Sequence, residues 1–370
     1  MVINTQNIIA VFNSFKHLSK FNSYSELTSG HINDTFLIKT DGSNDFVLQR
    51  LNSYVFKNAK QVILNKVKVS VFIQDQLNSS KINQAQQVLK FIKTLNDLPY
   101  YEDEEGDFWN LSIYIKNSKT FEKVESKAIA YEGGKLFGEF LHLTNCLNVN
   151  EIVEIIPDFH KMSFRYSQFG EALKNASKKR LKLASLEIEK VLELKNEMHI
   201  LENLKSSGKI PIRITHNDTK ISNALFSESN QGLCVIDTDT VMPGIIHYDF
   251  GDAVRTICNT SNEDETALSK VSFNISFFEA FTKGFLEKTY KQLTLLDVQN
   301  LALAAKTITF IMGLRMLTDF LNNDMYYKTV YEFHNLDRAK NQFKLVDSIS
   351  ENFNKMNEIT IMEFKKLKQK

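Results

Sequence analysis

The first third of the chain alternates apolar and polar residues in short runs, which is typical of β-strands. A glycine-containing turn over 30–34 and the Asp41-Gly42 pair separate the first three runs, and both are hairpin signals. An acidic segment, 102–106, separates the last two runs, and we interpret it as a solvated loop. We expect antiparallel strands at 23–28, 35–40, 46–51, 87–94 and 108–115.

Helical spacing of apolar residues appears first over 55–77, between the third and fourth strands, and dominates after residue 115. One segment of strands and loops, 210–252, interrupts it. The predicted fold class is α+β, with a small antiparallel-sheet lobe over 1–117 and a large, mainly helical lobe over 118–370. The helices expected in the second lobe are 128–143, 150–175, 178–206, 263–290, 295–322 and 336–369.

The composition is that of a soluble globular protein. The 370 residues are enough for two domains, and 43% hydrophobic and 24% charged residues are ordinary proportions. A net charge of +1 gives no indication of binding to nucleic acid or to an anionic membrane. We therefore expect small-molecule partners and a monomer or weak dimer.

Three features indicate a cytoplasmic protein. The N-terminus lacks a basic segment followed by an apolar core, so no signal peptide is predicted. The most apolar segment, 301–317, contains Lys306 and Arg315, and we expect it to be too short and too charged to span a bilayer. The three cysteines show neither metal-ligand spacing nor a disulfide framework, which fits a reducing compartment.

The pattern His216-x-Asp218-x-x-x-x-Asn223 is the first candidate for chemistry. A loop with this spacing can present Asp218 to an acceptor hydroxyl, whose proton it takes, while Asn223 offers a neutral oxygen to Mg²⁺. We expect His216 to hold the loop through backbone hydrogen bonds. Asp and Asn are also common in turns for local reasons, so an ordinary loop is the alternative for this pattern alone.

The apolar run 233–236 ends in a second candidate, Asp237 and Asp239. Residues two apart in an extended strand project to the same side, so both carboxylates could reach one metal ion. A turn is the alternative for such a pair alone. Because both patterns occur in order and one hairpin, 226–231, separates them, we favour a kinase that phosphorylates a small molecule with ATP and Mg²⁺.

The region 216–237 resembles the aminoglycoside phosphotransferase superfamily, which includes choline, homoserine and methylthioribose kinases. Motifs along nearly the whole chain are similar to those of a narrower group, the N-acetylhexosamine 1-kinases. This resemblance implies a two-lobed, protein-kinase-like fold, ATP and Mg²⁺ as cofactors, and phosphorylation of the anomeric hydroxyl of free GlcNAc or GalNAc. The motifs lie at 29–36, 46–52, 55–58, 156–160, 165–166, 234–244, 248–252, 313–321 and 334–338.

The resemblance also implies roles for single residues. Asp218 matches the catalytic acid, and Asn223 and Asp237 match the metal ligands, with Asp239 as a candidate extra ligand. The segment 30–35 lies where the family's nucleotide-covering loop belongs. We expect nucleotide contacts from Gly30, Asn33, Thr35 and Arg50. We expect sugar contacts from His31, Asp34, Arg165, Tyr166 and Arg315.

Two departures from the kinase pattern affect the expected nucleotide site. The segment 30–35 has one glycine, which weakens the case for phosphate binding by backbone amides. The strand 46–51 carries Gln49-Arg50 where many kinases place a lysine, and the helix 55–77 contains no glutamate, so a lysine–glutamate pair cannot form from these elements. Arg50 could contact phosphate with its planar donors, or strand alternation could place Gln49 inward instead.

Four alternatives stay open at this point. Arg315 could form a surface ion pair with Asp319 at i, i+4, and Tyr166 could be a packed aromatic residue. The acceptor could be an amino alcohol, a thioribose or an aminoglycoside, although the basic C-terminus disfavours a cationic antibiotic. The chain could also be a silent nucleotide- or sugar-binding protein, which we disfavour because burying several acids without a metal is costly.

Overall fold

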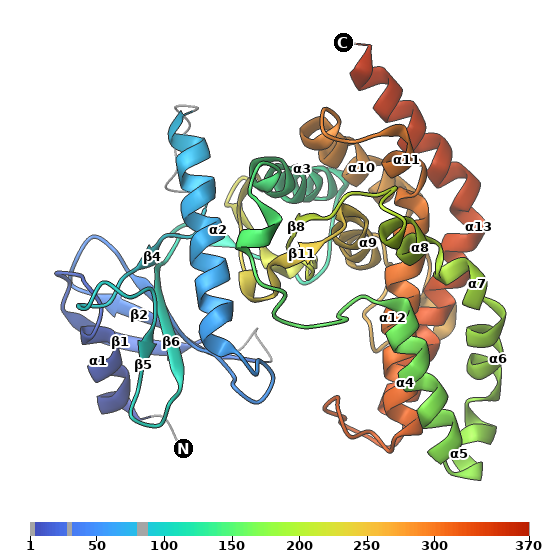
Figure 1. Ribbon diagram of the computed structural model, residues 1–370, viewed down its shortest axis with the longest axis horizontal. Coiled ribbons are helices and arrows are strands. Elements are labelled where there is room, and N and C mark those ends of the chain that lie inside the picture. The colour runs from blue at the N-terminus through green and yellow to red at the C-terminus, as the bar shows by residue number, and fades with distance from the viewer. Residues whose placement is uncertain (1–3, 28–31, 80–87, 370) are drawn as a thin grey trace. The chain divides into compact units, whose positions relative to one another are not determined.

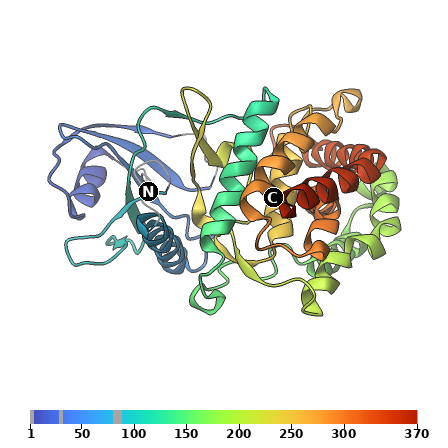
Figure 2. The ribbon, with the colours of Figure 1, turned by 90° about the horizontal axis from the view of Figure 1, so that it is seen from above.

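A computed structural model describes residues 4–27, 32–79 and 88–369 (Figures 1 and 2). The predicted site residues Gly30 and His31 lie outside the described residues. The chain forms two compact units, and each unit is made of more than one segment of the sequence. The sheet unit comprises Met1–Lys119, Leu143–Ile156 and Leu225–Pro243, and the helical unit comprises Thr120–His142, Pro157–Ala224 and Gly244–Lys370.

The sheet unit is built on an antiparallel sheet with the order β1-β2-β3-β6-β4, and β5 also pairs with β6. The predicted strand 87–94 is reduced to the two residues of β4, because the chain then turns so that Thr94 bridges to Phe15. The α+β class is confirmed. The strands are β1 (Phe21–Glu26), β2 (Asp34–Thr40), β3 (Phe46–Arg50), β4 (Phe91–Ile92), β5 (Tyr101–Glu102) and β6 (Phe108–Ile113).

Two helices cover apolar clusters of the sheet unit. The alternating pattern did not predict α1 (Thr5–Asn13), whose Phe12 is fully buried in a cluster with Trp109. The second helix, α2 (Ala59–Ser79), begins later than the expected residue 55, because a turn over Asn52 precedes it. In Figure 1, α2 runs alongside β6, and its Val62 and Ile63 pack in a second cluster.

Short elements complete the sheet unit. The strands β9 and β10 form the predicted hairpin, with its turn at 228–231, and β7 adds to the other side of β9. The bounds are β7 (Ser118–Lys119), η2 (Val149–Glu151), β9 (Ala224–Ser227), β10 (Gly232–Val235) and η4 (Thr238–Thr240).

The helical unit is organised around α12 (Leu301–Leu321), which packs against α4, α9 and α13 (Figure 1). β8 (Arg213–Thr215) pairs with β11 (Met242–Gly244), the strand in which this unit resumes. The other elements are α3 (Lys127–Thr144), α4 (Met162–Asn175), η3 (Ile221–Asn223), α9 (Ile246–Ile257), η5 (Leu268–Lys270), α10 (Ile275–Thr289), α11 (Leu295–Gln299) and α13 (His334–Lys368).

The helix α12 is long and apolar enough to cross a bilayer, since it has 21 residues and a mean hydropathy of 1.4 in its most apolar window. The expectation that this segment is too short was therefore wrong. However, 89% of that window is buried inside the protein, and even Lys306 is 7% exposed. These observations identify α12 as a core helix.

Three predicted helices have different bounds. The helix expected at 150–175 begins at Met162, because Pro157 and a left-handed Asp158 (φ 59°) precede it. The helix expected at 263–290 begins at Ile275, where the Asn274 side chain caps two backbone N–H groups. The helix expected at 178–206 is four short helices, α5 (Lys178–Leu183), α6 (Ser185–Glu193), α7 (Lys195–Met198) and α8 (Ile200–Ser206).

The helix α9 was missed, because 210–252 was expected to hold strands and loops. All but one of its twelve residues are buried, and its charged residues Asp249, Asp252 and Arg255 recur every three positions along one side that faces protein rather than water. This helix matters for the site described below, because it carries Asp249, which accepts hydrogen bonds from the backbone of the loop after β8.

Candidate active site

The loop after β8 is held by buried groups of the helical unit. His216 is fully buried with its ring edge-on to Phe137 and Phe140, and its Nδ1 accepts from the Asp218 N–H at 3.3 Å. Asp249, on α9, accepts from the backbone N–H groups of His216 (2.8 Å) and Asn217 (2.7 Å). Burial raises the pKa of Asp249 to about 6, so this carboxylate is mostly ionised at pH 7. The loop backbone is therefore fixed before any ligand binds.

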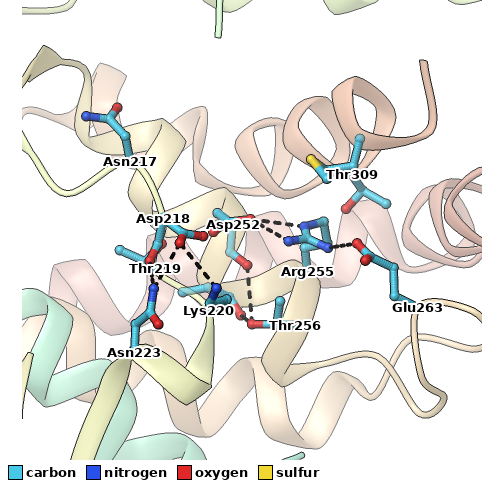
Figure 3. Close-up of polar contacts among 12 residues, drawn as sticks. Asn217, Asp218, Thr219, Lys220, Asn223, Asp252, Arg255, Thr256, Glu263 and Thr309 are labelled. Atoms are coloured by element: carbon cyan, nitrogen blue, oxygen red, sulfur yellow. Dashed lines mark hydrogen bonds and ion pairs between the residues drawn. The ribbon is translucent and has the colours of Figure 1, made fainter. Parts of the chain in front are cut away.

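The structure brings Asp218 and Asn223 together, as the spacing predicts. The Asn223 Nδ2 donates to the Asp218 carbonyl (2.8 Å) and to its Oδ2 (3.0 Å), as Figure 3 shows. Lys220 lies on the same loop, with its Nζ 3.4 Å from that Oδ2. The Asp218 side chain is 33% exposed, so it is accessible to a ligand, whereas Asn223 is 4% exposed.

A row of alternating charges begins beside Asp218 (Figure 3). Asp252 lies on α9, and its Oδ1 accepts hydrogen bonds from Arg255 Nε (3.0 Å) and Nη2 (2.9 Å). Its Oδ2 has no hydrogen-bond partner among the described residues. Arg255 also contacts Glu263 at 2.8 Å, and Glu263 contacts Arg338 at 3.1 Å. Burial and the nearby Asp218 charge raise the pKa of Asp252, while Arg255 lowers it.

A second group of polar side chains surrounds the start of this loop. His160 is buried, and its Nε2 lies 3.3 Å from the Asn217 carbonyl oxygen, while its Nδ1 has no partner among the described residues. Burial, and then the charge of Arg315, lowers the pKa of His160 to about 3, so the ring is neutral at pH 7. Burial and Arg315 also lower the pKa of Arg165 to about 10.

Two predicted sugar ligands, Arg165 and Arg315, meet around Phe159. Arg165 donates to the Phe159 carbonyl at 2.5 Å, and the Arg315 guanidinium lies over the Phe159 ring at 5.6 Å. Neither arginine forms a salt bridge with a carboxylate in the part of the chain that the structure describes. The alternative pair of Arg315 with Asp319 is absent there, because Asp319 accepts from the N–H groups of Tyr326 and Tyr327 instead.

The third predicted sugar ligand in this unit, Tyr166, is packed between helices. Its hydroxyl donates to the Val191 carbonyl at 2.8 Å, and its ring stacks on Phe310. Burial raises its pKa. These contacts match the alternative of a packed aromatic residue, and a sugar contact from Tyr166 stays a prediction.

The sheet unit holds the residues expected at the nucleotide. Strand alternation places Gln49 beside Asp239, and its Nε2 donates to Asp239 Oδ2 at 3.1 Å. Asn33 donates to the same oxygen at 2.6 Å. Arg50 instead pairs with Asp34 (2.7 Å) and with Asp107 at the other end of its guanidinium. Two predicted ligands, Arg50 and Asp34, thus bind each other.

Asp237 has a left-handed backbone, with φ 57° and ψ 51°, at the start of η4. Few non-glycine residues adopt this conformation, and Asp is one of the residues that tolerate it. Such conformations concentrate at functional sites. Thr35, the remaining predicted nucleotide ligand, lies in β2 opposite Gln49.

Several residues of these clusters were not singled out from the sequence. Lys220 and Asp252 stand inside motifs that were identified, so their positions next to Asp218 were available signals. His160 also stands inside an identified motif, 156–160, whereas Lys66 had no comparable signal, because its partner Asp239 is 173 residues away.

Comparison with known proteins identifies the family. Residues 23–280 match the profile of the phosphotransferase enzyme family. An aminoglycoside phosphotransferase from Alicyclobacillus acidocaldarius has a TM-score of 0.61 at 11% identity, covering 96% of this chain and 98% of that one. A choline kinase from Cryptosporidium parvum has a TM-score of 0.56 at 13% identity, covering 98% and 99%.

An amicoumacin kinase, solved with AMP-PNP and Ca²⁺, has a TM-score of 0.59 at 11% identity, covering 93% of this chain and 94% of that one. At such identities these likenesses show the fold, and they confirm the kinase-like architecture. The family profile spans most of the chain, including both the loop at Asp218 and the hairpin before Asp237. The chain therefore belongs to the phosphotransferase enzyme family.

Proposed function

We propose that this phosphotransferase moves the γ-phosphoryl group of ATP to the anomeric hydroxyl of a free N-acetylhexosamine. The observation that carries the proposal is the contact between Asp218 and Asn223 on a loop fixed by Asp249. The motifs shared with N-acetylhexosamine 1-kinases support the choice of acceptor.

Asp218 orients the sugar hydroxyl and accepts its proton. Asn223 and Lys220 both contact Oδ2, which leaves Oδ1 for the hydroxyl among the described residues. As the sugar oxygen bonds to the γ-phosphorus, the bond from that phosphorus to the bridging oxygen breaks and ADP leaves. Placement matters more than basicity here, because the transition state of phosphoryl transfer is loose.

The residues that hold Mg²⁺ in this proposal are Asn223 and Asp237. The donor set fits, because Mg²⁺ prefers carboxylate and amide oxygens and the Asn223 nitrogen is already used by Asp218. Asn223 directly precedes β9, and Asp237 follows two residues after the end of β10. Bound Mg²⁺ neutralises charge on the phosphates.

The charge around the acceptor site supports a sugar over a cationic acceptor. Arg165 and Arg315 have no carboxylate partner among the described residues, and the His160 ring beside them is neutral. A choline, an ethanolamine or an aminoglycoside would bring further positive charge to these two guanidinium groups. An amide carbonyl or hydroxyl oxygen instead accepts their hydrogen bonds.

The direct test is a coupled ADP-release screen against free monosaccharides and amino alcohols. GlcNAc and GalNAc are expected to give turnover, and phosphorus NMR of the product is expected to show a phosphate at carbon 1. Glucosamine is the matched control, because it differs from GlcNAc in carrying a cationic amine in place of the acetamide.

Turnover of choline or glucosamine above that of GlcNAc would overturn the acceptor assignment. Binding of ATP without ADP release from any acceptor would favour the silent binding protein. Phosphorylation of GlcNAc at carbon 6 would retain the acceptor and reject the anomeric position.

A further inference from the structure

A buried ion pair in the sheet unit joins Lys66, on α2, to Asp239, in η4. The Lys66 Nζ lies 2.5 Å from Asp239 Oδ1, and the two side chains are 4% and 3% exposed. Gln49 connects them, since its Oε1 accepts from Lys66 at 2.7 Å and its Nε2 donates to Asp239 Oδ2. Asn33 also donates to this oxygen. Each Asp239 oxygen therefore already has a donor from the protein.

The arrangement reverses the polarity of the lysine–glutamate pair that the sequence excluded. The helix supplies the cation, and the acid follows the strand β10. Asn110 Nδ2 donates to Gln49 Oε1 at 3.1 Å, so the strand residue is held from its other side as well. In addition, Asn65 on α2 donates to the Val241 carbonyl at 3.1 Å. The helix α2 is thus bonded to the chain on both sides of Thr240, at Asp239 and at Val241.

Folding stability does not explain such a pair. Taking two charges out of water costs about as much as their attraction returns, and apolar replacements of buried pairs are often neutral or stabilising. The pair does fix the position of η4 relative to α2, because each buried charge needs the other as its partner. The pair therefore also restricts the position of Asp237, which lies two residues before Asp239 at the start of η4.

We propose that Lys66 and Asp239 are positioning residues that hold η4, and with it the Asp237 carboxylate, for the metal–nucleotide complex. This proposal rests on the proposed function in one respect, the role of Asp237. It gives Asp239 a different task from that of a metal ligand, because both of its oxygens are already engaged.

The first variant changes the length of the acidic side chain in the pair without removing its charge. Asp239→Glu keeps the carboxylate but lengthens it by one methylene, so the pair can persist only if η4 shifts. Titration calorimetry with AMP-PNP, in Mg²⁺ and in EDTA, measures binding without any acceptor. We expect the Mg²⁺-dependent affinity to fall about tenfold, as for other groups that orient metal ligands, with the melting temperature close to wild type.

Lys66→Met is the second variant, and Lys68→Met is its matched control. Lys68 lies on the same helix in an exposed pair with Glu151, where the side chains are 44% and 47% exposed. Lys66→Met is expected to weaken binding in Mg²⁺ more than in EDTA, and Lys68→Met to change neither. If Asp239→Glu binds AMP-PNP with the wild-type Mg²⁺ dependence, the pair is only structural and the proposal is wrong.

Failure of the proposed function gives a different result. If no sugar is phosphorylated but AMP-PNP binding depends on Mg²⁺ and on Asp239, the positioning role stands without the acceptor assignment. If wild-type binding does not depend on Mg²⁺ at all, both the metal site and the positioning role fall, whatever the sugar screen shows.

Discussion

The polar clusters of the two units differ in how completely they satisfy themselves. In the sheet unit, both oxygens of Asp239 accept hydrogen bonds from Lys66, Gln49 or Asn33. In the helical unit, Asp252 Oδ2 and His160 Nδ1 are buried without a partner among the described residues. Both clusters contain buried charge, and they lie in a chain where most buried polar atoms are paired.

The difference suggests different tasks. A closed network fixes its members and has no bond left to offer, so it is suited to holding other residues in place. We call the group around Asp252, His160 and Arg315 the open cluster. Its unpaired buried atoms cost free energy in the free protein, and a ligand that supplies the missing hydrogen-bond partners removes this cost. We therefore expect mutations in the open cluster to act on catalysis and acceptor binding, and mutations in the closed network to act on the position of η4.

The largest effect is expected at Asp218. Asp218→Asn keeps the shape and the contact with Asn223 but removes the proton acceptor, so kcat should fall by about 10²–10⁴-fold. The dissociation constant of ATP, measured by calorimetry, should stay near the wild-type value. Full activity in this variant would reject the assignment of the catalytic acid.

Asp237→Asn provides the contrasting variant. It is expected to raise the Mg²⁺ concentration needed for half-maximal ATP binding, because the carboxylate is a proposed metal ligand. An unchanged Mg²⁺ dependence would count against that role. The two variants together separate loss of the base from loss of the metal site.

What could be read from the sequence follows the same division. Asp218 and Asn223 were found because their relation is local, five residues apart on one loop. The closed network was missed, because Lys66 looks like an ordinary helical lysine until the fold brings Asp239 to it. Strand alternation did indicate that Gln49 could point inward, although Arg50 was preferred as the nucleotide contact. The helix α9 was missed although Asp249, Asp252 and Arg255 recur at helical spacing, because the segment expected to hold strands and loops was extended to residue 252, inside this helix.

Arg315 tests whether the open cluster binds the acceptor. Arg315→Gln removes a charged donor with no carboxylate partner among the described residues, so KM for GlcNAc should rise about 10–100-fold, the equivalent of about 1.5–3 kcal/mol. Steady-state kinetics should show KM for ATP unchanged. Lys179→Gln, which removes a cation from an exposed pair with Glu332, is the control. An equal loss for glucosamine and GlcNAc would contradict recognition of the acetamide.

His160 gives the open cluster a pH dependence. Burial lowers its pKa to about 3, whereas the unfolded chain has a pKa near the ordinary value of about 6.5. As the pH falls below 6.5 the unfolded state takes up a proton first, so this residue makes folding weaker with falling pH until about pH 3 is reached.

His160→Gln removes this term from the free energy of unfolding. Between pH 7 and pH 5 the wild type should lose about 2 kcal/mol more than the variant, measured by urea denaturation at each pH. His142→Gln, at an exposed histidine, should match the wild type. Parallel pH profiles for wild type and His160→Gln would show that the ring is not held neutral.

The smallest effect is expected at Arg50, and it sharpens the boundary of the closed network. The Arg50 side chain is 20% exposed and its guanidinium is shared between Asp34 and Asp107, and partly exposed ion pairs contribute about 1 kcal/mol or less. Arg50→Gln should therefore lower the free energy of unfolding by about 1 kcal/mol and leave KM for ATP unchanged.

Gln49→Ala, one residue earlier, removes the bridge between Lys66 and Asp239 and should raise KM for ATP, because η4 loses a support. The opposite ranking of the two variants would return the phosphate contact to Arg50 and make Gln49 a structural residue.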